Sequence, residues 1–106
     1  MNTNIDREKI VNILHSTLQT YLEEHGEKVE FDEFENTKLF GGDGILDSIG
    51  LVSFIVEVEE VLEDEYNIAV ILADEKAMSR RTSPFGRISY LADYIVELLD
   101  ENSNEK

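Results

Sequence analysis

Three segments of the chain carry apolar residues at α-helical spacing, and they constrain the fold more than any other feature. The first, about residues 5–24, repeats Ile10, Ile13, Leu14, Leu18, Tyr21 and Leu22. The second, about Ser48 to Glu65, places on one side Leu51, Phe54, Ile55, Val58, Val61 and Leu62. The third, about Ile88–Asp100, aligns Ile88, Leu91, Ala92, Ile95, Leu98 and Leu99. Because such a stripe must be buried against another element, the pattern predicts an all-α fold with one shared core.

A long loop is expected between the first two helices. Asn4 or Asp6 could cap the start of the first helix, and Gly26 is expected to end it. Residues 27–47 have three glycines and no sustained periodicity, and loops of this length are often functional. We expect four apolar side chains to hold the loop on the core: Phe31, Phe34, Leu39 and Phe40.

The segment between the second and third helices is irregular. Residues 66–72 are β-branched and apolar, but no second strand is available to pair with them, so an extended segment packed on the core is expected. A short helical turn is expected around residues 74–79, and Pro84 and Gly86 break the chain before the last helix. With residues 101–106 as a flexible tail, the expected fold is a single domain over 1–106. It would be a four-helix bundle with three longer helices, one short helix and a long loop between helices one and two.

Composition and charge exclude several classes of function. No apolar run approaches the ~20 residues that span a membrane, and the N-terminus lacks the pattern of a signal peptide. Without cysteine there is no disulfide framework, so a cytoplasmic protein is expected. A net charge of −15 opposes binding to nucleic acid or to anionic lipid. The charge could keep the surface soluble or steer it toward basic partners, and both interpretations stay open.

A glycine-rich loop leads to one serine at the expected start of the second helix. The sequence is Gly42-Asp43-Gly44-Ile45-Leu46-Asp47-Ser48-Ile49-Gly50. A helix N-terminus favours a phosphate group. Asp47 and Ile49 flank the serine directly, which does not match the G-x-S-x-G pattern of serine hydrolases. No obvious base stands beside it in the sequence, so Ser48 is interpreted as an attachment point rather than as a nucleophile.

A second apolar set lies on the opposite side of the second helix. Ile49, Val52 and Val56, here called the apolar strip, fall among Ser53, Glu59, Glu60, Glu63 and Asp64. They could be ordinary exposed apolar residues, which are common. They could also form a surface for a partner with an apolar groove and a basic rim. Because the strip begins beside Ser48, the partner surface is favoured.

These residues resemble the acyl carrier protein family, which includes the peptidyl and D-alanyl carriers. Asp47-Ser48-Ile49 resembles its Asp-Ser-Leu signature, and Leu39-Phe40 with Gly44 to Ser48 resembles the loop before its modified serine. Glu57 to Ile68 resembles the acidic end of its second helix, and Phe85 to Ile95 the start of its last helix. The likeness covers nearly the whole chain in the same order.

The resemblance implies a non-catalytic carrier that works as a monomer. Ser48 would be esterified by 4′-phosphopantetheine, transferred from coenzyme A by a phosphopantetheinyl transferase that uses magnesium. The thiol of this arm would hold acyl or aminoacyl groups as thioesters for enzymes of fatty acid, polyketide or related biosynthesis. Asp47 would help to orient the transferase's metal and substrate, and it could also cap the helix. Partner recognition would involve Ile49, Val52, Ser53, Val56, Glu59, Glu60 and Glu63.

Some residues depart from the family pattern and indicate a specialised member. Ile49 replaces a leucine, Gly50 would weaken the helix by roughly 0.5–1 kcal/mol, and Ser53 stands where fatty-acid carriers are often acidic. Arg80, Arg81 and Arg87 could neutralise nearby acids or form a docking feature. His15 and His25 are expected to be surface or half-buried residues rather than metal ligands. The alternative function is a small acidic helical adaptor that carries no prosthetic group.

Overall fold

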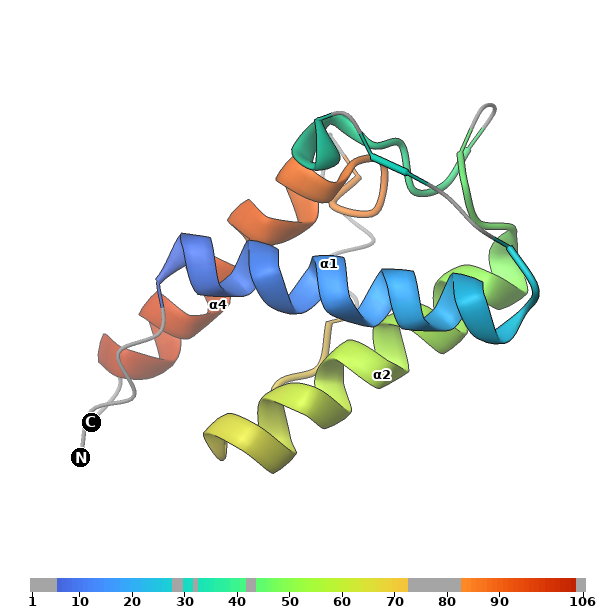
Figure 1. Cartoon of the computed structure of the whole chain (residues 1–106). Coiled ribbons are helices and arrows are strands. Elements are labelled where there is room, and N and C mark those ends of the chain that lie inside the picture. The colour runs from blue at the N-terminus through green and yellow to red at the C-terminus, as the bar shows by residue number, and fades with distance from the viewer. Residues whose placement is uncertain (1–5, 28–29, 32, 42–43, 73–82, 105–106) are drawn as a thin grey trace.

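A computed structural model describes residues 6–27, 30–31, 33–41, 44–72 and 83–104, with the backbone alone at 100–104. Its helices are α1 (Arg7–Glu24), α2 (Ser48–Tyr66) and α4 (Ile88–Asn104), with a 3₁₀ turn, η1 (Phe34–Asn36), between α1 and α2. Helix α1 contacts both α2 and α4, and η1 lies over the start of α4 (Figure 1). The all-α prediction is confirmed for these residues, where the only β-type pairing is an isolated bridge between Lys38 and Arg87. None of the described helices is long and apolar enough to cross a membrane.

Local hydrogen bonds explain where α1 begins and ends. Of the two predicted caps, Asp6 is the one observed: its Oδ1 accepts the N–H of Lys9 at 3.0 Å. At the other end Gly26 has φ +78°, and its N–H donates to the carbonyl of Glu23 at 3.1 Å. The N–H of Glu27 donates to the carbonyl of Leu22 at 2.8 Å, which completes a Schellman motif. The predicted stop at Gly26 is therefore confirmed.

The three apolar stripes meet in one core, as predicted. Five predicted members pack at the edge of the core and are only half-buried: Tyr21, Leu51, Val61, Leu98 and Leu99. Tyr94, which the stripe of α4 did not include, is 1% exposed. The fully buried residues of the helices are Ile10, Leu14, Leu18, Phe54, Val58, Leu62, Ile88, Leu91, Ala92, Tyr94 and Ile95, and Leu39 and Leu72 join them from the connecting segments.

Backbone hydrogen bonds and two buried leucines hold the loop before α2. The N–H of Leu39 donates to the carbonyl of Gly86 at 3.0 Å, and the N–H of Leu46 donates to the carbonyl of Leu39 at 2.8 Å. Phe31 and Phe34 pack against the core, as predicted. Phe40 was predicted to do the same but is 41% exposed. Adjacent residues of an extended segment point in opposite directions, so the inward position of Leu39 turns Phe40 outward.

The structure of residues 67–72, before the undescribed residues 73–82, agrees with its prediction, whereas the end of α4 does not. Residues 67–72 form neither a helix nor a strand, and Leu72 is buried, which confirms that this segment packs on the core. The helical turn expected at residues 74–79 lies outside the described residues. Helix α4 continues to Asn104, four residues into the tail predicted at 101–106, and residues 105–106 lie outside the described residues. The apolar stripe ends at Leu99, but no proline or glycine follows to stop the helix.

Candidate functional site at the start of α2

Ser48 is the first residue of α2, and its side chain is exposed. Asp47 immediately precedes it as the N-cap, and its Oδ1 accepts the N–H of Gly50 at 2.8 Å. The predicted capping role of Asp47 is confirmed. The first N–H groups of a helix have no carbonyl partner within it, and they carry the positive end of the helix dipole. Ser48 therefore presents a hydroxyl to solvent at a position that favours a negatively charged substituent.

The loop that delivers Ser48 is tightly folded. The N–H of Gly44 donates to the carbonyl of Gly41 at 2.7 Å, and a Cβ at Gly44 would lie 2.6 Å from the Cα of Phe40. Only glycine fits such a close approach of two backbone segments. Leu46, two residues before Ser48, is buried. The loop thus fixes the backbone on the N-terminal side of the serine.

Gly50 is buried where α1 meets the first turn of α2. A Cβ at this position would lie 3.0 Å from the hydroxyl oxygen of Tyr21 and 3.1 Å from Oδ1 of Asp47. The glycine that seemed from the sequence only to weaken the helix therefore makes room for Tyr21. Its N–H is also the donor that Asp47 caps.

The apolar strip is on the surface of α2. Ile49 is 77% exposed, Val52 62% and Val56 44%. Among the polar residues predicted beside it, Glu60 and Glu63 are exposed and Ser53 is half-buried. The structure thus brings together on one helix the serine, the exposed apolar residues and two solvent-facing carboxylates.

Glu59 differs from the other residues predicted for partner recognition. It is half-buried, and its Oε2 accepts the backbone N–H of Leu72 at 2.7 Å. The carboxylate therefore ties α2 to the extended segment that follows it.

Glu57, in the same acidic run, lines the cleft between α2 and α1. Burial raises the pKa of its carboxyl group, the charges of Glu24 and Glu60 raise it further, and His25 acts in the opposite direction. The ionised form of Glu57 is therefore disfavoured at the contact between the two helices. The strip, by contrast, is on the solvent side of α2.

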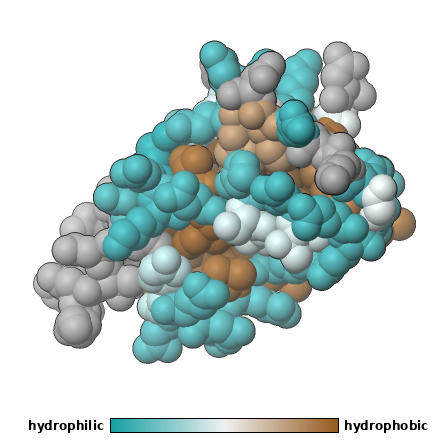
Figure 2. Space-filling model, in the orientation of Figure 1, coloured by the Kyte–Doolittle hydropathy of each residue, from teal (hydrophilic) through white to brown (hydrophobic). Residues whose placement is uncertain are grey.

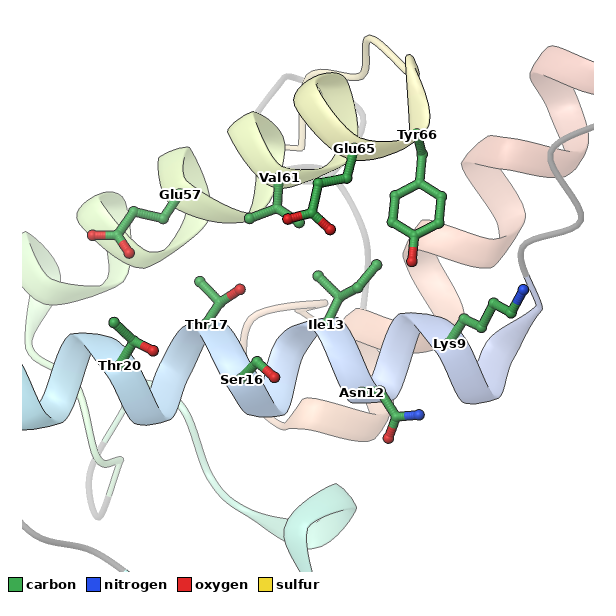
Figure 3. Close-up of a pocket in the computed structure, with 10 residues that line it drawn as sticks. All are labelled: Lys9, Asn12, Ile13, Ser16, Thr17, Thr20, Glu57, Val61, Glu65 and Tyr66. Carbon is green, nitrogen blue, oxygen red and sulfur yellow. The ribbon is translucent and has the colours of Figure 1, made fainter.

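An open cleft of about 510 Å³ runs between α1 and α2. Side chains from α1, including Thr17 and Thr20, point toward Val61 and Glu57 of α2, and Lys9 lies at one end (Figure 3). In the space-filling view, apolar surface shows in this region between hydrophilic borders (Figure 2). The cleft begins nine residues after Ser48, which corresponds to about 13 Å along the helix. It is separate from the serine.

Local contacts account for His15 and Arg87, two of the basic residues noted in the sequence. His15 is half-buried and packs edge-on against Phe31 and Phe34, at centroid distances of 5.5 and 4.7 Å. Nη1 of Arg87 donates to the carbonyl of Asn36 at 2.6 Å, while Arg80 and Arg81 lie outside the described residues. Across the described parts of the chain, no group of three or more His, Asp or Glu side chains could hold a metal ion.

Ile71 is an exposed apolar residue that the sequence interpretation missed. It is 68% exposed, while its neighbour Leu72 is fully buried. Side chains of consecutive residues can point in opposite directions, which could have indicated an outward side chain at Ile71, but Val70, Ile71 and Leu72 were all expected on the core.

The chain was compared with protein-family models, with curated proteins and with solved structures. It matches none of them.

Proposed function

We propose that this protein is an acyl or aminoacyl carrier whose Ser48 bears 4′-phosphopantetheine. The observation that carries the proposal is the exposed hydroxyl of Ser48 on the first residue of α2, directly after the Asp47 cap. The apolar strip starts at the next residue, so a partner that reads the strip would also reach the serine. The resemblance of Asp47-Ser48-Ile49 to the family signature supports the same function.

The residues around Ser48 fit the phosphate of this group. A phosphodiester at the start of α2 would be stabilised by the helix dipole by about 0.3–1 kcal/mol. When bound, the group supplies a thiol, which the chain itself lacks because it has no cysteine. Asp47 would keep Ser48 at the helix start through its bond to Gly50, and its free oxygen could help to orient the transferase's magnesium.

The proposal extends to the fold and the partners. The family fold is a four-helix bundle, and the short helical turn expected around residues 74–79 would be its fourth helix. The transferase, the loading enzymes and the downstream synthases would each dock on the strip with Ser53, Glu60 and Glu63 around it. The cargo would be an acyl or aminoacyl thioester used in fatty acid, polyketide or related biosynthesis in the cytoplasm, with a monomeric carrier.

A second candidate function is an acidic adaptor without a prosthetic group. The observation that favours it is the same exposed strip, because an apolar surface with an acidic border can bind a partner without any covalent modification. The two functions differ only in what happens at Ser48.

Incubation with coenzyme A, magnesium and a promiscuous phosphopantetheinyl transferase distinguishes them. Intact-mass spectrometry should show one added phosphopantetheine on the wild-type protein and none on Ser48→Ala. Ser89→Ala is the matched control, because Ser89 also lies in the first turn of a helix, α4, and should leave modification unchanged. If several such transferases add no mass to the wild-type protein, the carrier is excluded and the adaptor remains.

A further inference from the structure

We infer that Glu59 is a positioning residue that holds Ile71 next to the apolar strip, where Ile71 becomes a contact for the phosphopantetheinyl transferase. The inference rests on the proposed function and adds to it in two ways. It adds Ile71, which lies outside α2, to the partner surface. It also replaces the expected role of Glu59, a charge that faces the partner, with that of a hydrogen-bond acceptor inside the carrier.

The first step is the contact between Glu59 and Leu72. The carboxylate of Glu59 accepts the Leu72 N–H at 2.7 Å across a separation of thirteen residues. The Leu72 side chain is fully buried, so both the side chain and the N–H of this residue fix its position. A hydrogen bond from an N–H to a charged acceptor is stronger than one between neutral groups. The extended segment is therefore held against α2 at this point.

The second step is the direction of Ile71. It directly precedes Leu72, whose side chain enters the core, and its own side chain points toward solvent. Its exposed fraction, 68%, agrees with this direction. On α2, Val52, Val56 and Glu59 follow one another at four and three residues, which places them along one face of the helix. Because Leu72 is bonded to Glu59, Ile71 lies at the end of the strip.

The third step is the partner that such a surface fits. Residues 48–72 include no Lys, Arg or His, whereas Glu60 and Glu63 are exposed beside the strip. Charge complementarity therefore requires a partner with an apolar patch and a rim of Lys or Arg. The transferase is the partner that must approach Ser48 itself, so we assign this surface to it.

Four variants test the inference through kcat/KM for transfer of phosphopantetheine to Ser48. Ile71→Ser and Glu59→Ala should each lower kcat/KM by about five- to tenfold, mainly through KM, because a buried apolar contact is lost or misplaced. Glu59→Gln should stay within about twofold of wild type, because its amide oxygen still accepts the Leu72 N–H. Glu60→Gln removes a charge of the partner surface and should lower kcat/KM. Tyr90→Ser, which removes an exposed apolar residue of α4, is the control without effect.

Amide hydrogen exchange of Leu72 gives a readout that does not depend on the transferase. Glu59→Ala should speed this exchange, while Glu59→Gln and Ile71→Ser should leave it close to wild type. The inference is overturned if Glu59→Gln loses as much kcat/KM as Glu59→Ala while Leu72 exchanges at the wild-type rate in both. It is also overturned if Ile71→Ser is modified as fast as wild type. A wild-type protein that accepts no phosphopantetheine overturns the proposed function instead, and the assignment of the transferase with it.

Discussion

At the scale of single residues, the site depends on a close contact between two helices. Gly50 is buried against α1, and a Cβ there would meet the Tyr21 hydroxyl and the Asp47 carboxylate at 3.0 and 3.1 Å. Tyr21 is itself held, because its ring packs on His25 at a centroid distance of 4.2 Å. The glycine thus costs helix propensity and in return permits this approach of α1 to the cap of α2.

The Gly50→Ala variant tests this explanation. Its gain in helix propensity should be outweighed by overpacking, so the free energy of unfolding should fall by about 1 kcal/mol. In a Tyr21→Phe background one of the two crowded oxygens is gone, and the same substitution should cost clearly less. A double-mutant cycle by urea denaturation measures the coupling. Equal effects of Gly50→Ala in both backgrounds would show that Tyr21 is not the reason for the glycine.

Asp47 combines a structural and a proposed functional role, and two variants separate them. Asp47→Ala removes the cap and should lower the free energy of unfolding by about 1 kcal/mol. Asp47→Asn keeps a good cap and should remain within a few tenths of wild type, about 0.3 kcal/mol. If the charge also helps the transferase, Asp47→Asn should still be modified more slowly than wild type. If Asp47→Asn is modified at the wild-type rate, Asp47 acts only as the helix cap.

At the scale of elements, α2 carries acidic residues in two different environments, one exposed to solvent and one in the cleft with α1. Glu60 and Glu63 face solvent, whereas Glu57 lines the cleft with α1, where burial and neighbouring carboxylates raise its pKa. A raised pKa in the folded state means that ionised Glu57 opposes folding. Its favourable contribution is present below the unfolded pKa, about 4.3, and is lost as pH rises through the folded pKa.

Glu57→Gln should therefore stabilise the protein at neutral pH. The expected gain is small, about 0.5 kcal/mol or less, because the side chain is partly solvated. The difference in melting temperature between Glu57→Gln and wild type should shrink below about pH 4, where both side chains are neutral. Glu63→Gln, on the solvent side of the same helix, is the comparison. A gain for Glu57→Gln that persists at pH 3 would show that charge is not its cause.

The helices and their caps were predicted from the sequence better than the contacts that join them. Helical spacing and the residues Asp6, Gly26 and Asp47 predicted three helices and their caps, because these signals are local. The particular residue pairs that join distant segments were not predicted. The packing of His15 on Phe34 and the bond from Leu72 to Glu59 depend on how the loops fold back, and no local pattern encodes this. At the site, the glycine-rich loop predicted Ser48 at the helix start and the helical wheel predicted the strip, whereas the exposure of Ile71 was not predicted.

At the scale of the whole molecule, which has a net charge of −15, the acidic residues beside the strip should govern how fast partners arrive. Charge reversal at Glu60 and Glu63, both exposed beside the strip, should slow phosphopantetheine transfer and make its rate less sensitive to salt. Far-ultraviolet circular dichroism should show an unchanged helical fold, and reversal of Glu8, an exposed residue on α1, is the matched control. An unchanged rate with unchanged salt dependence would leave the acidic surface with a role in solubility alone.

The central claim is that Ser48 carries a phosphopantetheine arm, and the most direct measurement is the mass of the protein isolated from its native cells. Intact-mass spectrometry followed by peptide mapping should find phosphopantetheine, free or loaded with cargo, on the peptide that contains Ser48. The mass of the cargo would also identify the class of acyl or aminoacyl group. A native protein whose Ser48 peptide is entirely unmodified, together with failure of every transferase in vitro, would contradict the claim.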